Sequence, residues 1–203
     1  ERLMLNHLTK KPEDYAGAFR RLPSKLLKLF VQAYQAYLFN KFLSARIKSG
    51  LALNSACVGD YVVNVERNGL PMLSMRKVVD EKALSEVNIS LKNGRLRLAL
   101  PLIGFKQAPS QGIQGEIEKK ILKDEGVSQE NFKIELIPEI SSKGELRTIV
   151  TPLRNFTVEE ISKDAVNTSK NAVKLHFMML RGSYATILLR EIMKTRNPVK
   201  AGF

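Results

Sequence analysis

The sequence predicts an α+β fold, with mixed or antiparallel sheets and a long helix near the N-terminus. Residues 23–50 repeat apolar side chains at spacings of three and four, which is typical of one buried face of a helix. Beyond Gly50 the apolar runs become short, and many of them alternate with polar residues as strands do. Two further helical stretches interrupt these runs, and this mixture favours α+β.

The long helix has signals at both ends. Pro23 suits a first-turn position and Gly50 suits the C-terminal end. At 1.5 Å per residue such a helix is roughly 40 Å long, enough to brace a whole domain. Four aromatic side chains could form a platform for stacked bases, but their helical spacing beneath leucines favours a place in the core. They are Tyr34, Tyr37, Phe39 and Phe42.

The remaining elements follow in order. We expect strands at 58–65 and 72–79, and then a hairpin of 87–91 with 95–100 about Asn93-Gly94. Residues 116–125 predict a short helix closed by Gly126, and the last helix is expected from Gly182-Ser183 to about Lys194. Residues 155–172 are polar, with a short helical turn expected at 158–161. Further strands are predicted at 132–137, 146–150 and 173–179.

The composition excludes several functional classes. The 203 residues are 44% hydrophobic and 26% charged, which is typical of a packed globular chain. One cysteine, Cys57, excludes an internal disulfide framework and a Cys-rich zinc site, and two distant histidines argue against a His-based metal site. No stretch has the spacing of a phosphate-binding or dinucleotide-binding glycine loop. We expect a soluble, cytoplasmic protein without a metal or a membrane span.

Positive charge is concentrated toward the two ends of the chain. The net charge is +13, with ten Lys and Arg against three Asp and Glu in residues 1–50, and nine against four in residues 154–203. This distribution favours a face that binds a polyanion. Arg20, Arg21, Lys25 and Lys28 form a basic cluster, in which the last three are three and four residues apart, share one helix face and could follow a phosphate backbone. A solvated face that binds nothing explains the same spacing equally well.

The segment Arg181-Gly182-Ser183-Tyr184 opens the last predicted helix. The glycine permits a sharp turn, and Ser183 is expected to cap the helix. Free N–H groups at a helix start, with Arg181 adjacent, suit an anion such as an RNA phosphate. A capped helix without a ligand is the alternative.

Residues 180–194, Leu-Arg-Gly-Ser-Tyr-Ala-Thr-Ile-Leu-Leu-Arg-Glu-Ile-Met-Lys, resemble the C-terminal signature of the TruD family of tRNA pseudouridine synthases. They depart from it at Leu180-Arg181, where Pro-Lys or Pro-Ala is common. Residues 19–23 and 30–40 are similar to the long helix that opens the inserted domain of the family, particularly in archaeal-type members. Three shorter matches follow in the expected order, so the resemblance covers essentially the whole chain. They are Gly59-Asp60, residues 101–104 and residues 144–147.

The resemblance implies an RNA isomerase that needs no cofactor. Such enzymes flip a uridine out of the RNA, detach the uracil and rejoin it to the ribose through carbon, and an aspartate is essential to this chemistry. The family acts at the thirteenth nucleotide of tRNA. Its aspartate motif, Gly-x-Lys-Asp-x-x-Ala-x-Thr-x-Gln, is absent here, because Lys123-Asp124 and Lys163-Asp164 both lack the flanking residues.

We therefore expect a C-terminal fragment that is inactive alone and whose partners are tRNA and a missing N-terminal half. Residues 1–19 would be a remnant of the catalytic domain or a linker, 20–143 the inserted domain, and 144–203 the C-terminal part of the split catalytic domain. By resemblance, the rim of the uridine pocket comprises Gly182, Ser183 and Tyr184, supported by Arg190 and Glu191. The expected RNA contacts are Arg20, Arg21, Lys25, Lys28, Arg147 and Arg181.

Two other classes of function stay open at this point. The chain could be a basic RNA-binding module that performs no chemistry. It could also be a protein-interaction domain whose positive charge is incidental.

Overall fold

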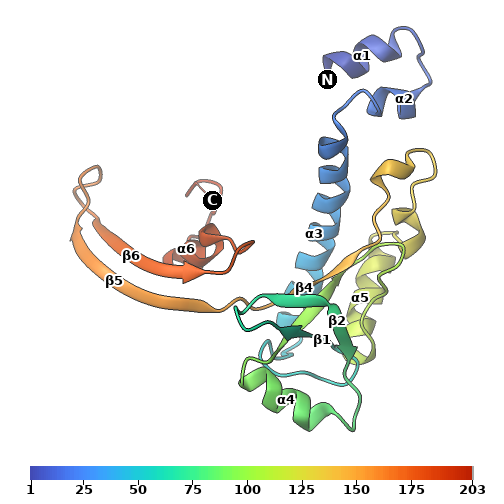
Figure 1. The fold of residues 1–203 in the computed structure, drawn as a ribbon. Coiled ribbons are helices and arrows are strands. Elements are labelled where there is room, and N and C mark those ends of the chain that lie inside the picture. Colours follow the sequence, from blue (N-terminus) through green and yellow to red (C-terminus); the bar gives the residue numbers. More distant parts are fainter. Residues whose placement is uncertain (203) are drawn as a thin grey trace. The chain divides into compact units, whose positions relative to one another are not determined.

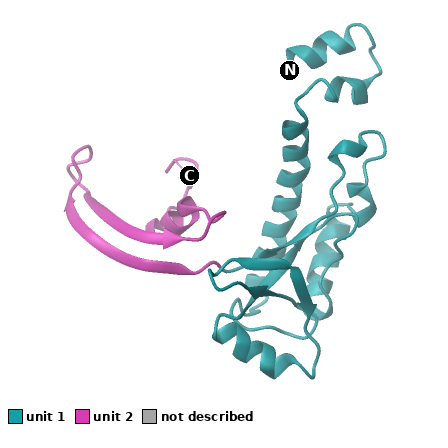
Figure 2. Ribbon diagram, in the orientation of Figure 1, with its two compact units in different colours: residues 1–150 teal, residues 151–203 magenta. Residues whose placement is uncertain are grey.

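The computed structural model describes residues 1–202, which form an α+β fold with antiparallel sheets, as predicted (Figure 1). The chain divides into two compact units, residues 1–150 and 151–203 (Figure 2), and each is described by itself. No helix in the described residues is long and apolar enough to span a membrane.

A four-stranded antiparallel sheet organises the first unit. Its order is β2-β1-β3-β4, so a central pair is flanked by two edge strands. The short first two helices, α1 (Arg2–Leu8) and α2 (Tyr15–Phe19), precede the long helix. The strands are β1 (Tyr61–Val65), β2 (Pro71–Val78), β3 (Leu96–Leu102) and β4 (Glu145–Thr148).

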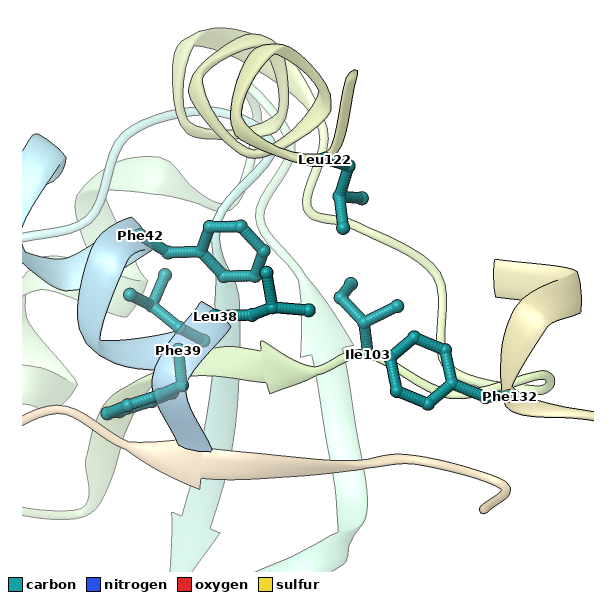
Figure 3. Close-up of a cluster of buried hydrophobic side chains, with 7 residues drawn as sticks. Leu38, Phe39, Phe42, Ile103, Leu122 and Phe132 are labelled. Atoms are coloured by element: carbon teal, nitrogen blue, oxygen red, sulfur yellow. The ribbon is translucent and has the colours of Figure 1, made fainter. Parts of the chain in front are cut away.

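The main core lies between the sheet and two helices. The long helix is α3 (Ser24–Lys48), and it packs on β3 and on α5 (Gly112–Asp124). Side chains from these three elements, Ile103 directly after β3, and Phe132 at the end of a short 3₁₀ helix form one apolar cluster (Figure 3). Phe39 and Phe42 are buried in this cluster, which confirms their predicted core role, whereas Tyr37 is 47% exposed. Burial of one helix face on a sheet is the main source of stability for such a helix.

The predicted hairpin at 87–100 is wrong. Residues 84–92 form a helix, α4 (Leu84–Lys92), and Gly94 ends it with a φ of +72°. Asn-Gly therefore marks a helix C-terminus here rather than a hairpin turn, because glycine adopts the left-handed conformation in both settings. Val87 is buried against Val62 and Leu98, so tertiary packing favours the helix.

The predicted strand at 132–137 is also wrong. Two single-turn 3₁₀ helices, η1 (Gln129–Phe132) and η2 (Pro138–Ile140), occupy this region. Ser128 and Asn131 close a capping box around η1, and Pro138 opens η2. These local hydrogen bonds and the fixed φ of proline favour the 3₁₀ helices over the strand that the weak alternation of apolar and polar residues predicted.

The second unit is an antiparallel ribbon of two strands with one helix. Its elements are β5 (Leu153–Lys163), β6 (Asn171–Met179) and α6 (Ala185–Met193). The helical turn expected at 158–161 is wrong, since these residues pair with β6 across the ribbon. A polar segment forms a strand here because its partner supplies the hydrogen bonds.

The compact units do not follow the predicted domain borders. β4 pairs with β3, so residues 145–148 complete the sheet of the first unit, although the prediction assigned them to the C-terminal part of the catalytic domain. The division at residue 150 reflects only which residues pack together. The assignment of residues 20–143 to an inserted domain stays a prediction.

Candidate nucleic-acid interface

A cavity of about 570 Å³ opens on the first unit between the N-terminal half of α3 and the segment that enters β4. Its walls carry three positive side chains, one carboxylate and several amide and hydroxyl groups. They include Lys28, Gln32, Gln35, Ser142, Lys143, Glu145 and Arg147.

Helix and strand periodicity place these side chains together. Lys28, Gln32 and Gln35 are four and three residues apart, so they lie on one face of α3. Glu145 and Arg147 are two residues apart in β4 and therefore share one face of the sheet. Their register with Leu102 and Leu100 of β3 puts them on the face that packs against α3.

A closed hydrogen-bond network forms one wall of the cavity. The buried Gln35 donates through Nε2 to the carbonyl of Ile103 at 2.6 Å and to Ser142 Oγ at 2.9 Å. Ser142 Oγ lies 3.1 Å from Gln35 Oε1. Because both ends of the Gln35 amide have partners, this wall of the cavity is rigid.

The cations of the cavity differ in how they are held. The guanidinium carbon of Arg147 lies 5.2 Å from the centre of the buried Phe39 ring, a cation–π contact that fixes the side chain without neutralising it. Within the described residues, Lys28, Lys143 and Arg147 form no ion pair. The full positive charge of all three is therefore available to an anion.

The other predicted basic residues are arranged differently from the expectation. α3 begins at Ser24, so Arg21 lies in the preceding turn and shares no helix face with Lys25 and Lys28. Arg20 donates to Glu139 Oε1 at 3.0 Å and to the carbonyl of Leu136 at 2.9 Å. Arg21 Nε lies 3.2 Å from His7 Nδ1. These arginines have intramolecular partners, and their contact with RNA stays a prediction.

The C-terminal motif lies in the second unit. Gly182 has a φ of +87°, and Ser183 N donates to the carbonyl of Leu180 at 3.1 Å. The predicted cap is wrong, because α6 starts at Ala185 with Tyr184 as its N-cap residue and without a side-chain cap. Tyr184 is 71% exposed, and Arg181 is also exposed.

Two residues of α6 complete the predicted rim. Arg190 is half-buried, and Glu191 is exposed and accepts a hydrogen bond from Lys194 Nζ at 2.6 Å. The hydrogen bond from Lys194 holds the pKa of Glu191 below its usual value. Glu191 is therefore ionised near neutral pH.

Neither Lys-Asp pair has the surroundings of a catalytic acid or base. Asp164 accepts N–H groups from Asn167 and Val166 in the turn between β5 and β6, which holds the pKa of its carboxyl below the usual value. Asp124 is exposed in the last turn of α5. No group of His, Cys, Asp and Glu that could hold a metal occurs in the described part of the chain.

The structure adds residues that sequence reasoning missed. Lys143 and Gln35 join Lys28 and Arg147 around one cavity, although these residues are far apart in the sequence. A signal for Lys143 was its position directly before the Gly144–Arg147 match. No local pattern pointed to Gln35, because its partners come from the loops after β3 and before β4.

Fold and charge together show an α+β chain in which three cations without ion-pair partners among the described residues lie around one cavity, an arrangement typical of proteins that bind polyanions. Residues 1–192 match the model of tRNA pseudouridine synthase D (TruD). The chain belongs to the TruD family.

The similar proteins include archaeal proteins named "Probable tRNA pseudouridine synthase D". The one from Methanosarcina acetivorans is 44% identical over 96% of this chain and 44% of its own length. The one from Pyrococcus furiosus is 34% identical over 96% of this chain and 45% of its own length. A crystal structure described as a tRNA pseudouridine synthase D (TruD) from Methanosarcina mazei is 43% identical, with a TM-score of 0.90, over 98% of this chain and 45% of that chain. The chain thus spans less than half the length of these relatives.

Proposed function

We propose that this chain is part of a tRNA pseudouridine synthase that isomerises a uridine, expected at tRNA position 13, to pseudouridine without a cofactor. The family match over residues 1–192, with the motif at 180–194 retained, carries this proposal. Residues 20–143 act as an inserted RNA-binding domain, and residues 144–203 supply the C-terminal wall of the active site. The catalytic aspartate comes from a part of the protein outside these 203 residues.

Each nominated residue has a role in this proposal. Gly182, Ser183 and Tyr184 line the uridine pocket, and Arg190 and Glu191 support it from α6. The exposed Tyr184 ring is able to stack on a flipped base. The RNA backbone is contacted by Arg20, Arg21, Lys25, Lys28, Arg147 and Arg181.

The exposure of the second unit supports a missing N-terminal half as the partner. No residue of β5 or α6 is buried, and two-stranded ribbons are at best marginally stable alone. Apolar side chains are exposed along the ribbon and on α6, and a partner that completes the catalytic domain would cover them. They are Phe156, Val158, Ile161, Val173, Met178, Ile187 and Ile192.

Complementation tests this function. The chain alone is expected to bind an unmodified tRNA transcript but to form no pseudouridine, whereas adding the N-terminal half of the M. mazei relative restores conversion of one uridine. Tyr184→Ala is expected to lower the conversion rate about tenfold through lost stacking, and Tyr184→Phe retains the rate because it keeps the ring. Pseudouridine is read by carbodiimide labelling and primer extension.

The alternative is a basic RNA-binding module without chemistry, which the unpaired cations of the cavity favour. Tight tRNA binding with no pseudouridine in the complemented protein would support this alternative. Conversion of the uridine would exclude it.

A further inference from the structure

The cavity between α3 and β4 has properties that the overall charge of the chain does not explain. It is concave, it has a rigid wall, and three cations on it have no ion-pair partner among residues 1–202. We propose that it binds one unpaired nucleotide of the RNA, separately from the uridine that reacts. The proposal rests on the proposed function, because that function makes RNA the ligand.

Size and shape favour a single nucleotide. A volume of about 570 Å³ is in the range of pockets that enclose small ligands. The convex surface of an A-form duplex cannot enter such a cavity, whereas a nucleotide from a loop, bulge or end is able to leave the stack and occupy it. The occupant is therefore a nucleotide from a single-stranded part of the RNA.

The charges of the walls fit the parts of a nucleotide. Lys28, Lys143 and Arg147 supply positive charge for a phosphate, and none of the three forms an ion pair within the described part of the chain. Glu145 on the same wall is a hydrogen-bond acceptor, which repels a phosphate but suits an amino or imino group of a base. The mixed charge therefore favours a nucleotide over a bare anion.

Arg147 offers both a positive charge for a phosphate and a flat surface for a base. Its guanidinium rests on the Phe39 ring, which belongs to the core, and the side chain is exposed on its other side. An arginine held in this way is able to contact a phosphate or to stack under a base at little entropic cost. Its neighbour Leu146 is buried on the opposite face of the sheet, so the strand cannot turn Arg147 away.

The test uses fluorescence anisotropy of a labelled tRNA transcript with the full chain at several salt concentrations. The variant Lys28→Ala/Lys143→Ala/Arg147→Ala is compared with the matched control Arg67→Ala/Lys92→Ala/Lys120→Ala. The control removes two exposed lysines and one exposed arginine of the same unit, also without ion pairs, that lie outside the cavity. Both variants lose three positive charges, so a difference in their affinity for tRNA measures the contribution of the cavity.

We expect the cavity variant to bind about tenfold more weakly and its salt slope to fall by about 0.7 for the lost phosphate contact. The control variant is expected to stay within about twofold of the unmodified chain, with the same slope. Equal losses in both variants, or no loss in either, would overturn the proposal. Lys143→Glu changes a single exposed loop residue, and its expected loss of affinity provides the same test if the triple variant does not fold.

Competition separates unpaired from paired RNA. A 12-nucleotide single strand is expected to displace the transcript, and the cavity substitutions are expected to weaken this competitor more than a 12-base-pair duplex. Equal sensitivity of the two competitors would overturn the choice of an unpaired nucleotide.

This inference and the proposed function fail in different ways. Binding needs no catalysis, so a complemented protein that forms no pseudouridine but binds RNA through the cavity contradicts the function alone. Conversion with an unchanged KM in the cavity variant contradicts the cavity site alone.

Discussion

At the scale of single residues, a buried polar cluster connects α3, the residue directly before β1, and α5. Arg46 and Asp60 are 0% and 2% exposed and form two hydrogen bonds, each of 2.9 Å. Arg46 also donates to Gln114 at 3.1 Å, and Gln114 donates to Glu118 at 2.9 Å. Glu118 accepts the backbone N–H of Ser110 at 2.6 Å. The cluster thereby fixes the long helix that carries part of the cavity.

Asp60→Ala is expected to lower the free energy of unfolding of the first unit by about 3 to 5 kcal/mol, because it leaves the buried Arg46 charge without its carboxylate partner. The control Glu116→Ala removes an exposed ion pair with Lys119 and is expected to cost less than about 1 kcal/mol. Urea unfolding followed by circular dichroism measures both. Similar losses in the two variants would contradict the role assigned to the cluster.

Glu118 makes the stability of the first unit depend on pH. Burial raises the pKa of its carboxyl from 4.5 to about 7, with a smaller contribution from Asp60, although three hydrogen bonds oppose the shift. Between these two pH values the unfolded chain releases a proton that the folded chain keeps. The free energy of unfolding therefore falls as the pH rises from 4.5 to 7, by up to about 3 kcal/mol, and this contribution is constant above pH 7.

Glu118→Gln removes the titrating carboxyl, so the free energy of unfolding of this variant is expected not to fall between pH 4.5 and pH 7. Urea unfolding between pH 5 and pH 8 tests this, with the exposed Glu116→Gln as the control that retains the fall. The same pH dependence in both variants would assign it to other groups.

At the scale of elements, α4 illustrates how one glycine sets a boundary. Gly94 has a φ of +72° and open space around it, so an added Cβ meets no atom within 4 Å. A substitution there is costly through the backbone alone.

Gly94→Ala is thus expected to destabilise the first unit by about 1 kcal/mol, whereas the exposed Ser85→Ala in the same helix stays within about 0.5 kcal/mol. Thermal unfolding of the two variants measures the difference. A stabilised Gly94→Ala variant would show that restriction of the unfolded chain outweighs the strain.

At the scale of the whole molecule, the two units differ in how much they bury. The first unit has three apolar clusters, whereas none of the residues in β5, β6 or α6 is buried. The second unit is therefore expected to owe its order to whatever covers it.

Amide hydrogen exchange tests this dependence. In the chain alone, amides of residues 153–179 are expected to exchange within seconds to minutes, and the N-terminal half of the M. mazei relative is expected to slow them at least about tenfold. The amides of β1 and β3 serve as an internal control, because they are buried within the first unit and should not change. Strong protection of β5 and β6 without the added half would contradict a missing partner.

The errors of sequence-based prediction have identifiable physical causes. The long helix was predictable because its periodicity extends over 25 residues. The hairpin at 87–100 was mistaken because Asn93-Gly94 ends a helix as readily as it turns a hairpin, and only the burial of Val87 separates the two. The strand β5 was missed because its own residues carry no clear strand pattern. It is a strand because it is hydrogen-bonded to β6.

Composition, periodicity and the motif at 180–194 can be read from the chain without its fold, and they were enough to establish the α+β class, the excess of positive charge and the family. The tertiary structure shows which cations lie together. It joins Arg20 to Glu139 and places Lys28 beside Lys143 and Arg147, although more than a hundred residues separate each pair. Such pairings depend on strand register and helix packing, which arise only when distant segments bury their apolar faces against one another.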